Sequence, residues 1–448
     1  MSKTVKIRKG VDIKLKGEAE KVFATAEMSD TFAIKPPDFH GLTPKLAVKV
    51  GDEVKAGQIL FFDKYNERVK FASPVSGEVA EVVRGAKRKI MEIRILADKE
   101  TRYAEGNAQN VGNMSRDQVV EALLDGGLWG YVRQRPYDII ANPDETPKSI
   151  FISAFDSAPL GVDNDFVVRG QEGEFQTGLD AVAKLTSGKV HLQVNNASSA
   201  VFTGAKGVQV NRVDGPHPAG LVGPQIHHID PINKGDRVWT LNIQDVIAIG
   251  RYLSTGKFDA SRVVAVAGSQ VDKPRYVKAV MGASISSLVK GNLKEGPNRI
   301  ISGNVLTGER IGEDGYLGYY HYMVTVIPED EEMEFFGWIA PGLKKFSLSR
   351  TFFSWLTPNK KYALGTSQQG EHRAFVMSGQ YDKVFPMDVL PVYLIKAIMV
   401  GDIELMENLG IYEVAPEDFA LCEFACTSKT HVQEIVRGGL DLVHKECG

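Results

Sequence analysis

Short runs in which apolar and polar residues alternate dominate the first hundred residues of the chain. This alternation has the period of a strand that buries one face, and the Gly, Pro and Asp residues between the runs favour turns. The sequence therefore predicts a β domain over residues 1–100. The runs that carry this prediction are KTVKIRK, PKLAVKV, ILFF, RVKF, GEVAEVV and KIMEIRIL.

The period of the pattern changes from about residue 115. Ser115 and Gln118 have the spacing of a capping box, and an apolar stripe follows until Gly126-Gly127 ends the predicted helix. Strands and helices then alternate, which predicts an α/β layer with parallel strands, assigned to a domain at 101–257. Strands are expected at 149–154, 190–194, 237–240 and 262–268, and helices within 172–187 and 242–254.

After Gly268 the chain changes to short strands and one small helix, in the stretch SQVDKPRYVKAVMGASISSLVKG. We expect a compact α+β unit at 258–330, with the acidic segment EDEEMEF (329–335) as a solvated boundary. The last part of the chain, 331–448, is expected to be mainly helical. Its clearest helical stripe consists of Val432, Ile435, Val436, Gly439, Leu440 and Val443.

Composition indicates an ordinary globular protein of about three domains, because 43% of the 448 residues are hydrophobic and 24% are charged. The net charge of −3 argues against a nucleic-acid partner. The longest apolar stretch, 389–400, contains Lys396 and is too short to cross a bilayer. The N-terminus lacks the apolar core of a signal peptide, and three cysteines indicate a reducing compartment. We therefore expect a cytoplasmic protein without a span of its own.

The stretch 48–79 has the turns of a domain that carries lipoate or biotin on a lysine at a hairpin tip. The midpoint between Leu60 and Pro74 falls on Asn66-Glu67, and Lys64 lies away from it. We therefore expect a β-sandwich of this shape without a carrier lysine. A lipoyl or biotinyl carrier remains the alternative.

Nucleotide-binding glycine loops are missing, because the chain contains neither G-x-G-x-x-G nor G-x-x-x-x-G-K-[ST]. The nearest glycine cluster, GGLWGYVRQRP (126–136), contains Trp129, Tyr131, Arg133 and Arg135, whose bulk would obstruct a phosphate. The two arginines could attract an anion or a partner's carboxylates, but we expect them to be solvated surface side chains.

Metal sites are also weakly supported. Cys422 and Cys426 share a helical face, and His431 and Cys447 are the only further soft ligands nearby. An iron–sulfur cluster usually takes four cysteines, so buried structural thiols are favoured over zinc. The histidines of GPHPAGLVGPQIHHID (215–230) could bind a metal or contact a ligand or partner, but a rigid structural loop is favoured.

Several stretches together resemble one family, the A subunits of the Na+-translocating NADH:quinone reductases. They span nearly the whole chain in the family's order. The region PPDFHGLTPK (36–45) and Thr427 depart from the family's pattern, which puts ligand contacts near Phe39 and His40 in doubt. The similar stretches are KIRKGVDIKLKG (6–17), 48–64, 71–95, 133–160, 215–256, 262–288, 371–391 and 409–426.

The resemblance implies an architecture of four parts. These are a biotinyl/lipoyl-like barrel-sandwich hybrid (1–100), a Rossmann-like α/β domain related to the flavin subunit of respiratory NADH dehydrogenase (101–257), a β-grasp module of the SLBB type (258–330) and a helical domain without an iron–sulfur cluster (331–448). The glycine-rich flavin loop and the cluster cysteines of the relatives are absent, so the electron-transfer scaffold is expected without its redox centres.

The function implied is that of a peripheral subunit on the cytoplasmic side of a bacterial inner membrane. Its complex would pass electrons from NADH to quinone, such as ubiquinone, and export sodium in a respiratory chain. NADH, flavins and iron–sulfur centres would lie on partner subunits, and this chain would carry no catalytic residue, cofactor or metal. A stand-alone soluble ligand-binding protein is the other alternative. Aromatic and donor side chains suited to a quinone headgroup are Phe39, His40, Trp129, Tyr131 and Arg133.

Overall fold

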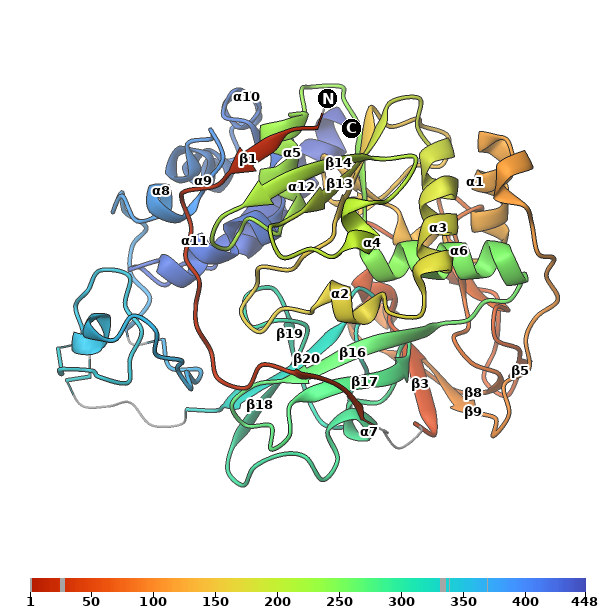
Figure 1. The fold of residues 1–448 in the computed structure, drawn as a ribbon, viewed down its shortest axis with the longest axis horizontal. Coiled ribbons are helices and arrows are strands. Elements are labelled where there is room, and N and C mark those ends of the chain that lie inside the picture. The colour runs from red at the N-terminus through yellow and green to blue at the C-terminus, as the bar shows by residue number, and fades with distance from the viewer. Residues whose placement is uncertain (1, 25–28, 331–335, 338, 369) are drawn as a thin grey trace.

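The computed structural model describes residues 2–24, 29–330, 336–337, 339–368 and 370–448. Its strands form four sheets, with seven, six, four and three strands. Helices lie against the seven-stranded sheet and gather in the last third of the chain (Figure 1). Most of the acidic boundary predicted at 329–335, namely residues 331–335, lies outside the described residues.

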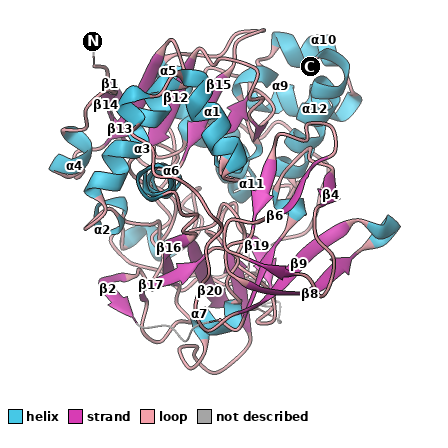
Figure 2. Ribbon diagram, turned by 90° about the vertical axis from the view of Figure 1, so that its right-hand side faces the viewer, coloured by secondary structure: helices cyan, strands magenta, loops and turns pink. Residues whose placement is uncertain are grey.

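The N-terminal β domain consists of the two smaller sheets, whose facing sides bury Val54, Leu60, Val79 and Ile93. One long hairpin extends from the body, and a short 3-10 turn, η2 (Ala86–Arg88), forms its tip (Figure 2). The four-stranded sheet has the order β3 (Thr31–Ile34), β9 (Ile90–Ala97), β8 (Gly77–Arg84), β5 (Glu53–Val54), and the three-stranded sheet has the order β4 (Pro44–Leu46), β6 (Ile59–Asp63), β7 (Lys70–Ala72). A further 3-10 turn, η1 (Pro36–Asp38), follows β3.

The seven-stranded sheet is mixed. Its first five strands are parallel, and β10 and β11 are antiparallel additions at one edge. The prediction of a parallel α/β layer is therefore confirmed for the central strands. The strand order is β1 (Thr4–Lys6), β14 (Gln209–Asp214), β13 (Lys189–Val194), β12 (Ser149–Ser153), β15 (Val238–Leu241), β10 (Arg133–Arg135), β11 (Ile139–Ile140).

Two helices of this region, α1 (Arg116–Asp125) and α6 (Ile243–Thr255), begin at a capping box. Helix α1 has the predicted capping box, in which the Ser115 hydroxyl accepts the Gln118 amide and the Gln118 side chain accepts the Ser115 amide. The others are α2 (Asn164–Val167), α3 (Glu172–Lys184), α4 (Ala200–Thr203), α5 (Val222–Ile229) and α6 (Ile243–Thr255), with 3-10 turns η3 (Val111–Asn113) and η4 (Trp129–Tyr131).

One strand that was predicted for the α/β layer lies in a different sheet. The strand expected at 262–268 is β16 (Ser261–Ala267), and it lies in the six-stranded sheet. Six of its seven residues are buried, and a strand covered on both faces has the same apolar sequence in either sheet. The order of this sheet is β19 (Glu309–Ile311), β18 (Asn298–Ser302), β20 (Met323–Pro328), β16, β17 (Arg275–Val280), β2 (Glu20–Ala24), and α7 (Ile285–Val289) follows β17.

The first two strands of the chain do not belong to the β domain that was predicted for residues 1–100. Strand β1 pairs with β14, with Val5 opposite Val213, and β2 pairs with β17. The extended chain between β1 and β2 runs down the molecule from one sheet to the other (Figure 1). Ile13 and Leu15 of this segment are buried. Alternation indicates a strand but carries no information about its partner, which explains the difference.

The C-terminal part is helical from residue 381 onward, as predicted, whereas the described residues of 336–380 form one 3-10 turn and otherwise irregular chain. Helix α12 (Val432–Cys447) buries Val432, Val436, Gly439, Leu440 and Val443, and it packs on α9 (Pro391–Val400). No helix among the described residues is long and apolar enough to cross a membrane. The other elements are α8 (Tyr381–Val384), α9 (Pro391–Val400), α10 (Ile403–Asn408), α11 (Ala420–Ala425) and the 3-10 turns η5 (Phe353–Leu356), η6 (Ile411–Glu413) and η7 (Pro416–Phe419).

Candidate functional site

A cavity of about 420 Å³ lies at the carboxyl ends of β12 and β15. The chain runs from β12 outward to β13 and β14 and then returns to β15 on the other side of β12, so the strand order reverses between β12 and β15. In open α/β sheets, ligands bind in the crevice at such a reversal. Ser153 ends β12 and Leu241 ends β15, and both line the cavity.

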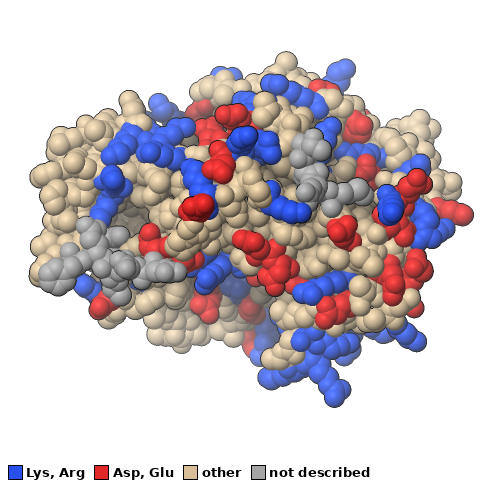
Figure 3. All heavy atoms as spheres, turned by 90° about the horizontal axis from the view of Figure 1, so that it is seen from below, with Lys and Arg blue, Asp and Glu red and all other residues tan. Residues whose placement is uncertain are grey.

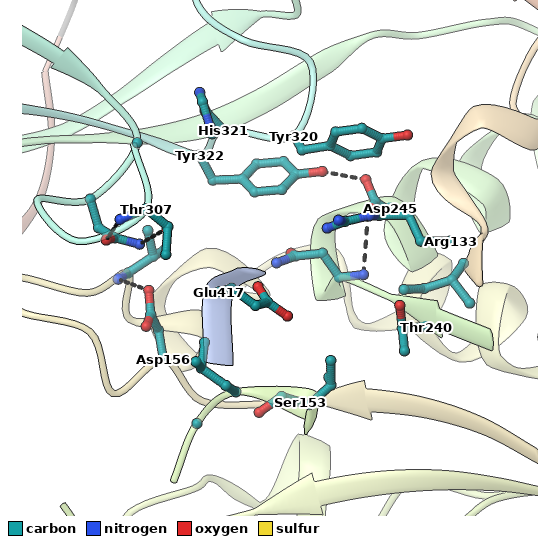
Figure 4. Close-up of a pocket in the computed structure, with 18 of the residues that line it drawn as sticks. Arg133, Ser153, Asp156, Thr240, Asp245, Thr307, Tyr320, His321, Tyr322 and Glu417 are labelled. Carbon is teal, nitrogen blue, oxygen red and sulfur yellow. Dashed lines mark hydrogen bonds between the residues drawn. The ribbon is translucent and has the colours of Figure 1, made fainter. Parts of the chain in front are cut away.

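Three parts of the chain close around this cavity (Figure 4). The sheet contributes strand ends and the beginnings of α5 and α6, the six-stranded sheet contributes the loops before β19 and β20, and the C-terminal part contributes two short segments. The principal polar lining residues are Arg133, Asp138, Ser153, Asp156, Asn164, Thr240, Asn242, Asp245, Asn304, Thr307, His321, Glu417 and Gln433, and the aromatic ones are Tyr131, Phe155, Tyr320 and Tyr322.

Arg133 is the positive charge of the lining. It begins β10, its guanidinium donates to the Asp138 carboxylate, and it lies 5.1 Å from the centre of the Tyr320 ring. Burial opposes ionisation of Asp138, but the guanidinium groups of Arg133 and Arg135 outweigh it and lower the pKa of this carboxyl. Arg133 is therefore held in place by an ionised partner and an aromatic face before any ligand arrives.

Asp245 is a second carboxyl group of the lining, and its pKa is raised, whereas that of Asp138 is lowered. It caps the first turn of α6 by accepting the Asn242 amide (3.1 Å), and it also accepts the Tyr322 hydroxyl (Figure 4). Burial raises the pKa of Asp245 to about 6, although the Tyr322 hydrogen bond and Arg262 act in the other direction. This group can therefore exchange a proton near neutral pH.

Two further ionisable groups of the lining, His321 and Tyr131, stay neutral. Burial lowers the pKa of His321 to about 3, and its Nδ1 lies 2.8 Å from the Ser302 hydroxyl. Burial also raises the pKa of Tyr131 to about 12, so its hydroxyl keeps its proton. The cavity thus combines one fixed cation, aromatic faces, neutral hydrogen-bonding groups and several carboxyl groups, of which Asp245 titrates near neutrality.

The expectation that Arg133 and Arg135 are solvated surface side chains is wrong for Arg135, and Arg133 is half-buried in the lining of the cavity. Arg135 is 1% exposed, and its guanidinium donates to Asp418 (2.6 Å) and to Glu417 (2.6 Å). These carboxylates lie more than 280 positions away in the sequence, so the local pattern around residues 126–136 could not reveal them. A buried charge of this kind requires partners, and the C-terminal part provides them.

Of the five side chains proposed for a quinone headgroup, the structure brings Tyr131 and Arg133 together at the cavity. Phe39 is buried in the aromatic core, where its ring centre lies 4.1 Å from that of Phe71. Trp129 is buried as well, and its indole N–H donates to the Ala141 carbonyl (2.7 Å). The imidazole Nε2 of His40, on the surface, donates to Asp441 (2.7 Å).

Several lining residues were not predicted from the sequence. Tyr320, His321 and Tyr322 lie in the run LGYYHYMV. Its four consecutive aromatic or imidazole side chains could have indicated a ligand-binding segment. Asp245 has the position of a helix-capping carboxylate, which is its local role. Nothing in the sequence near Glu417 indicates that it lines this cavity.

The segment 215–230 is only partly the loop that was expected, because its second half forms α5. Pro224 lies in the first turn of that helix, where its missing N–H leaves no hydrogen bond broken. His217 Nδ1 lies 3.0 Å from the Ser157 hydroxyl, and His227 Nδ1 lies 2.7 Å from Glu413. These histidines connect separate parts of the fold.

The cysteines are free thiols, buried at Cys422 and Cys426 and exposed at Cys447. The Sγ atom of Cys426 accepts the Thr430 amide (3.4 Å). Throughout the part of the chain that the structure describes, no three His, Cys, Asp or Glu side chains are grouped so that they could hold a metal ion.

Three family models match the chain: "NqrA N-terminal barrel-sandwich hybrid domain" at 5–98, "NqrA second alpha/beta domain" at 114–258 and "NQRA C-terminal domain" at 263–312. They confirm the barrel-sandwich and α/β domains expected from the sequence. A crystal structure of NAD+-reducing [NiFe]-hydrogenase in the air-oxidized state is 14% identical over 48% of this chain and 47% of that chain, with a TM-score of only 0.35.

Full-length relatives, named as A subunits of the Na(+)-translocating NADH-quinone reductase, are closely similar to the chain. The protein of Hahella chejuensis is 40% identical over 99% of this chain and 100% of the relative. That of Marinomonas sp. is 39% identical over 98% and 99%, and that of Pseudomonas aeruginosa is 38% identical over 99% and 100%. With identity of this level along its whole length, the chain belongs to the NqrA family, the A subunits of the Na+-translocating NADH-quinone reductases.

Proposed function

We propose that the chain works as a peripheral subunit of a membrane-bound, Na+-translocating NADH:quinone reductase, on the cytoplasmic side of the membrane. The observation that carries this proposal is the match to whole relatives of that name over 99% of the chain. NADH, flavins and iron–sulfur centres are assigned to partner subunits. Within this proposal, 101–257 is a Rossmann-like domain without a flavin loop, 258–330 is a β-grasp module, and 331–448 is a helical domain without a cluster.

The assembly is tested by purifying a tagged copy of the chain from native membranes in mild detergent. Mass spectrometry should find, at equal stoichiometry, multi-span membrane subunits and a partner that oxidises NADH. Recovery of the chain alone from the soluble fraction would contradict the proposal and favour a stand-alone ligand-binding protein.

Within this function, the cavity at the ends of β12 and β15 is the proposed quinone contact. Its volume of about 420 Å³ is in the range of small-molecule sites. A quinone ring is planar and carries two carbonyl acceptors. The rings of Tyr320 and Tyr322 offer aromatic faces, and Arg133 and the protonated Tyr131 offer hydrogen-bond donors. The proposal assigns binding to this chain and electron delivery to its partners.

Two conservative variants test this site. Tyr131→Phe removes one hydroxyl, and Arg133→Lys keeps the charge but removes the planar fork that Asp138 orients. Each should weaken binding of a short-chain ubiquinone analogue by about three- to tenfold, the effect of one lost hydrogen bond, as measured by isothermal titration calorimetry.

The matched control is His40→Ala, because His40 lies on the surface and contacts Asp441. Its affinity should equal that of the wild type. If all three variants bind the analogue as the wild type does, the cavity is not the quinone contact. If His40→Ala alone weakens binding, the contact lies on the surface near Asp441.

A further inference from the structure

An unusual surface lies at the segment 336–368, whose described residues we call the basic-apolar lobe. Seven large apolar side chains of the lobe are between 36% and 60% exposed, among 20 such side chains in the whole described chain. The lobe makes up less than a tenth of the sequence, so these side chains are concentrated here. They are Phe336, Ile339, Leu343, Leu348, Phe353, Trp355 and Leu356.

The charge of the lobe is entirely positive. Its sequence contains Lys344, Lys345, Arg350, Lys360 and Lys361 and no Asp or Glu. Acidic side chains border it, because Glu329 and Asp330 accept hydrogen bonds from Thr366 and Ser367 at the end of the lobe. Lys361 forms an ion pair with Glu18, outside the lobe (3.0 Å). The Arg350 guanidinium lies 5.9 Å from the centre of the Trp355 ring, so a cation and an interfacial aromatic side chain share one place on the surface.

The lobe stands at one end of the molecule. It follows β20 and lies to the left of the six-stranded sheet in Figure 1. In Figure 3 the left-hand end of the surface consists mainly of uncharged atoms, with Lys and Arg side chains and a few Asp or Glu side chains among them. Backbone bonds at Tyr362, whose N–H donates to Lys14 and whose carbonyl accepts the Lys16 amide (both 2.8 Å), attach the lobe to the N-terminal segment.

Two kinds of partner could cover exposed apolar side chains, namely another protein or a lipid surface. The buried centre of a protein interface is depleted in lysine, whereas four of the five cations of the lobe are lysines. Aromatic and leucine side chains beside Lys and Arg are the composition of segments that lie in the headgroup region of anionic membranes. The composition therefore favours lipid.

We propose that the basic-apolar lobe binds the surface of an anionic phospholipid bilayer. The apolar side chains enter the headgroup region, and the cations contact lipid phosphates. This inference rests on the proposed function, since it names the surface by which a peripheral subunit touches the membrane next to its complex.

The test uses the purified full-length chain and two kinds of vesicle, one of phosphatidylcholine alone and one mixed equally with phosphatidylglycerol. Co-sedimentation should show binding to the mixed vesicles, weaker binding as salt screens the charges, and little binding to phosphatidylcholine alone. The double variants Lys344→Glu/Arg350→Glu and Phe353→Ser/Trp355→Ser should each weaken binding about tenfold or more. All four side chains are exposed, so the fold should be retained.

The matched control is Lys87→Glu/Arg88→Glu at the exposed tip of the β8–β9 hairpin, which changes the net charge equally. This variant should keep wild-type binding to within about twofold, because its charges are far from the lobe's apolar side chains. Wild-type protein that does not sediment with anionic vesicles, or a control that loses binding as strongly as the lobe variants, would overturn the proposal.

Purification of the same variants from native membranes separates this proposal from the proposed function. If vesicles are not bound but the lobe variants lose the membrane subunits, the lobe is a protein-docking surface and the lipid proposal is wrong. If the wild-type chain itself brings down no membrane subunit, the proposed function fails, and the vesicle result still decides the lobe.

Discussion

Arg135 joins the seven-stranded sheet to the C-terminal part through a buried ion-pair network. Its guanidinium contacts Asp418 and Glu417, and burial raises the pKa of both carboxyls although Arg135 opposes this shift. Arg135→Met should lower the free energy of unfolding by about 3–5 kcal/mol at neutral pH, because the buried Asp418 and the half-buried Glu417 lose their counter-charge. Urea denaturation measures this loss.

The matched control for this prediction is Arg84→Met, at an exposed position at the end of β8. The stability of that variant should stay within about 0.5 kcal/mol of the wild type. A loss of similar size in both variants would mean that the network around Arg135 adds nothing beyond a general effect of removing an arginine.

Buried neutral histidines make stability depend on pH. Burial lowers the pKa of His217 to about 4 and of His321 to about 3. The unfolded chain takes up these protons below about pH 6.5 and the folded chain does not, so stability is complete above that pH and falls as the pH drops towards 4. Each histidine contributes a slope of up to about 1.4 kcal/mol per pH unit.

His321→Gln tests this dependence in urea titrations between about pH 7 and pH 5. The free energy of unfolding should fall less steeply with acid in the variant than in the wild type. Asp245, with its pKa raised to about 6, acts in the opposite direction, but it is present in both proteins and its effect cancels in the comparison. Equal slopes would contradict the prediction.

At the scale of elements, α3 and α6 touch backbone to backbone (Figure 1). A Cβ atom added at Gly178 of α3 would lie 2.0 Å from the Val246 carbonyl oxygen of α6. Gly178→Ala should therefore force the helices apart and lower the free energy of unfolding by about 1–3 kcal/mol. Gly173→Ala, on the same helix but in open space, should stabilise the protein by up to about 1 kcal/mol. Thermal unfolding of the two variants in opposite directions would confirm the contact.

At the scale of the whole molecule, the N-terminal segment holds separate sheets and the C-terminal helices together. The Ile7 amide donates to Asp214, the Gly10 amide to Lys383 and the Val11 amide to His217. Hydrogen exchange should therefore be slow over residues 7–16, although most of this segment is neither helix nor strand. Exchange as fast as in the exposed segment 105–108 would show that the segment is not fixed to the body.

Much of the candidate site could not be predicted from the sequence, because its residues come from distant parts of the chain. Tyr131 and Arg133 stood out because their neighbours crowd a glycine cluster, which is a local property. Asp245, Tyr322 and Glu417 face the same cavity from three distant parts of the chain. The local sequence around each residue indicates only an ordinary structural role, such as helix capping for Asp245. Only tertiary packing brings the three side chains together.

By itself the sequence determined the local elements, because periodicity, capping residues and turns act over a few positions. Examples are the capping box at Ser115, the buried stripe of α12 and the apolar run of β16. Tertiary structure alone decided which strands pair, because strands buried on both faces fit more than one sheet. It also decided that Arg135 is buried, because the carboxylates that make its burial tolerable come from the far end of the chain.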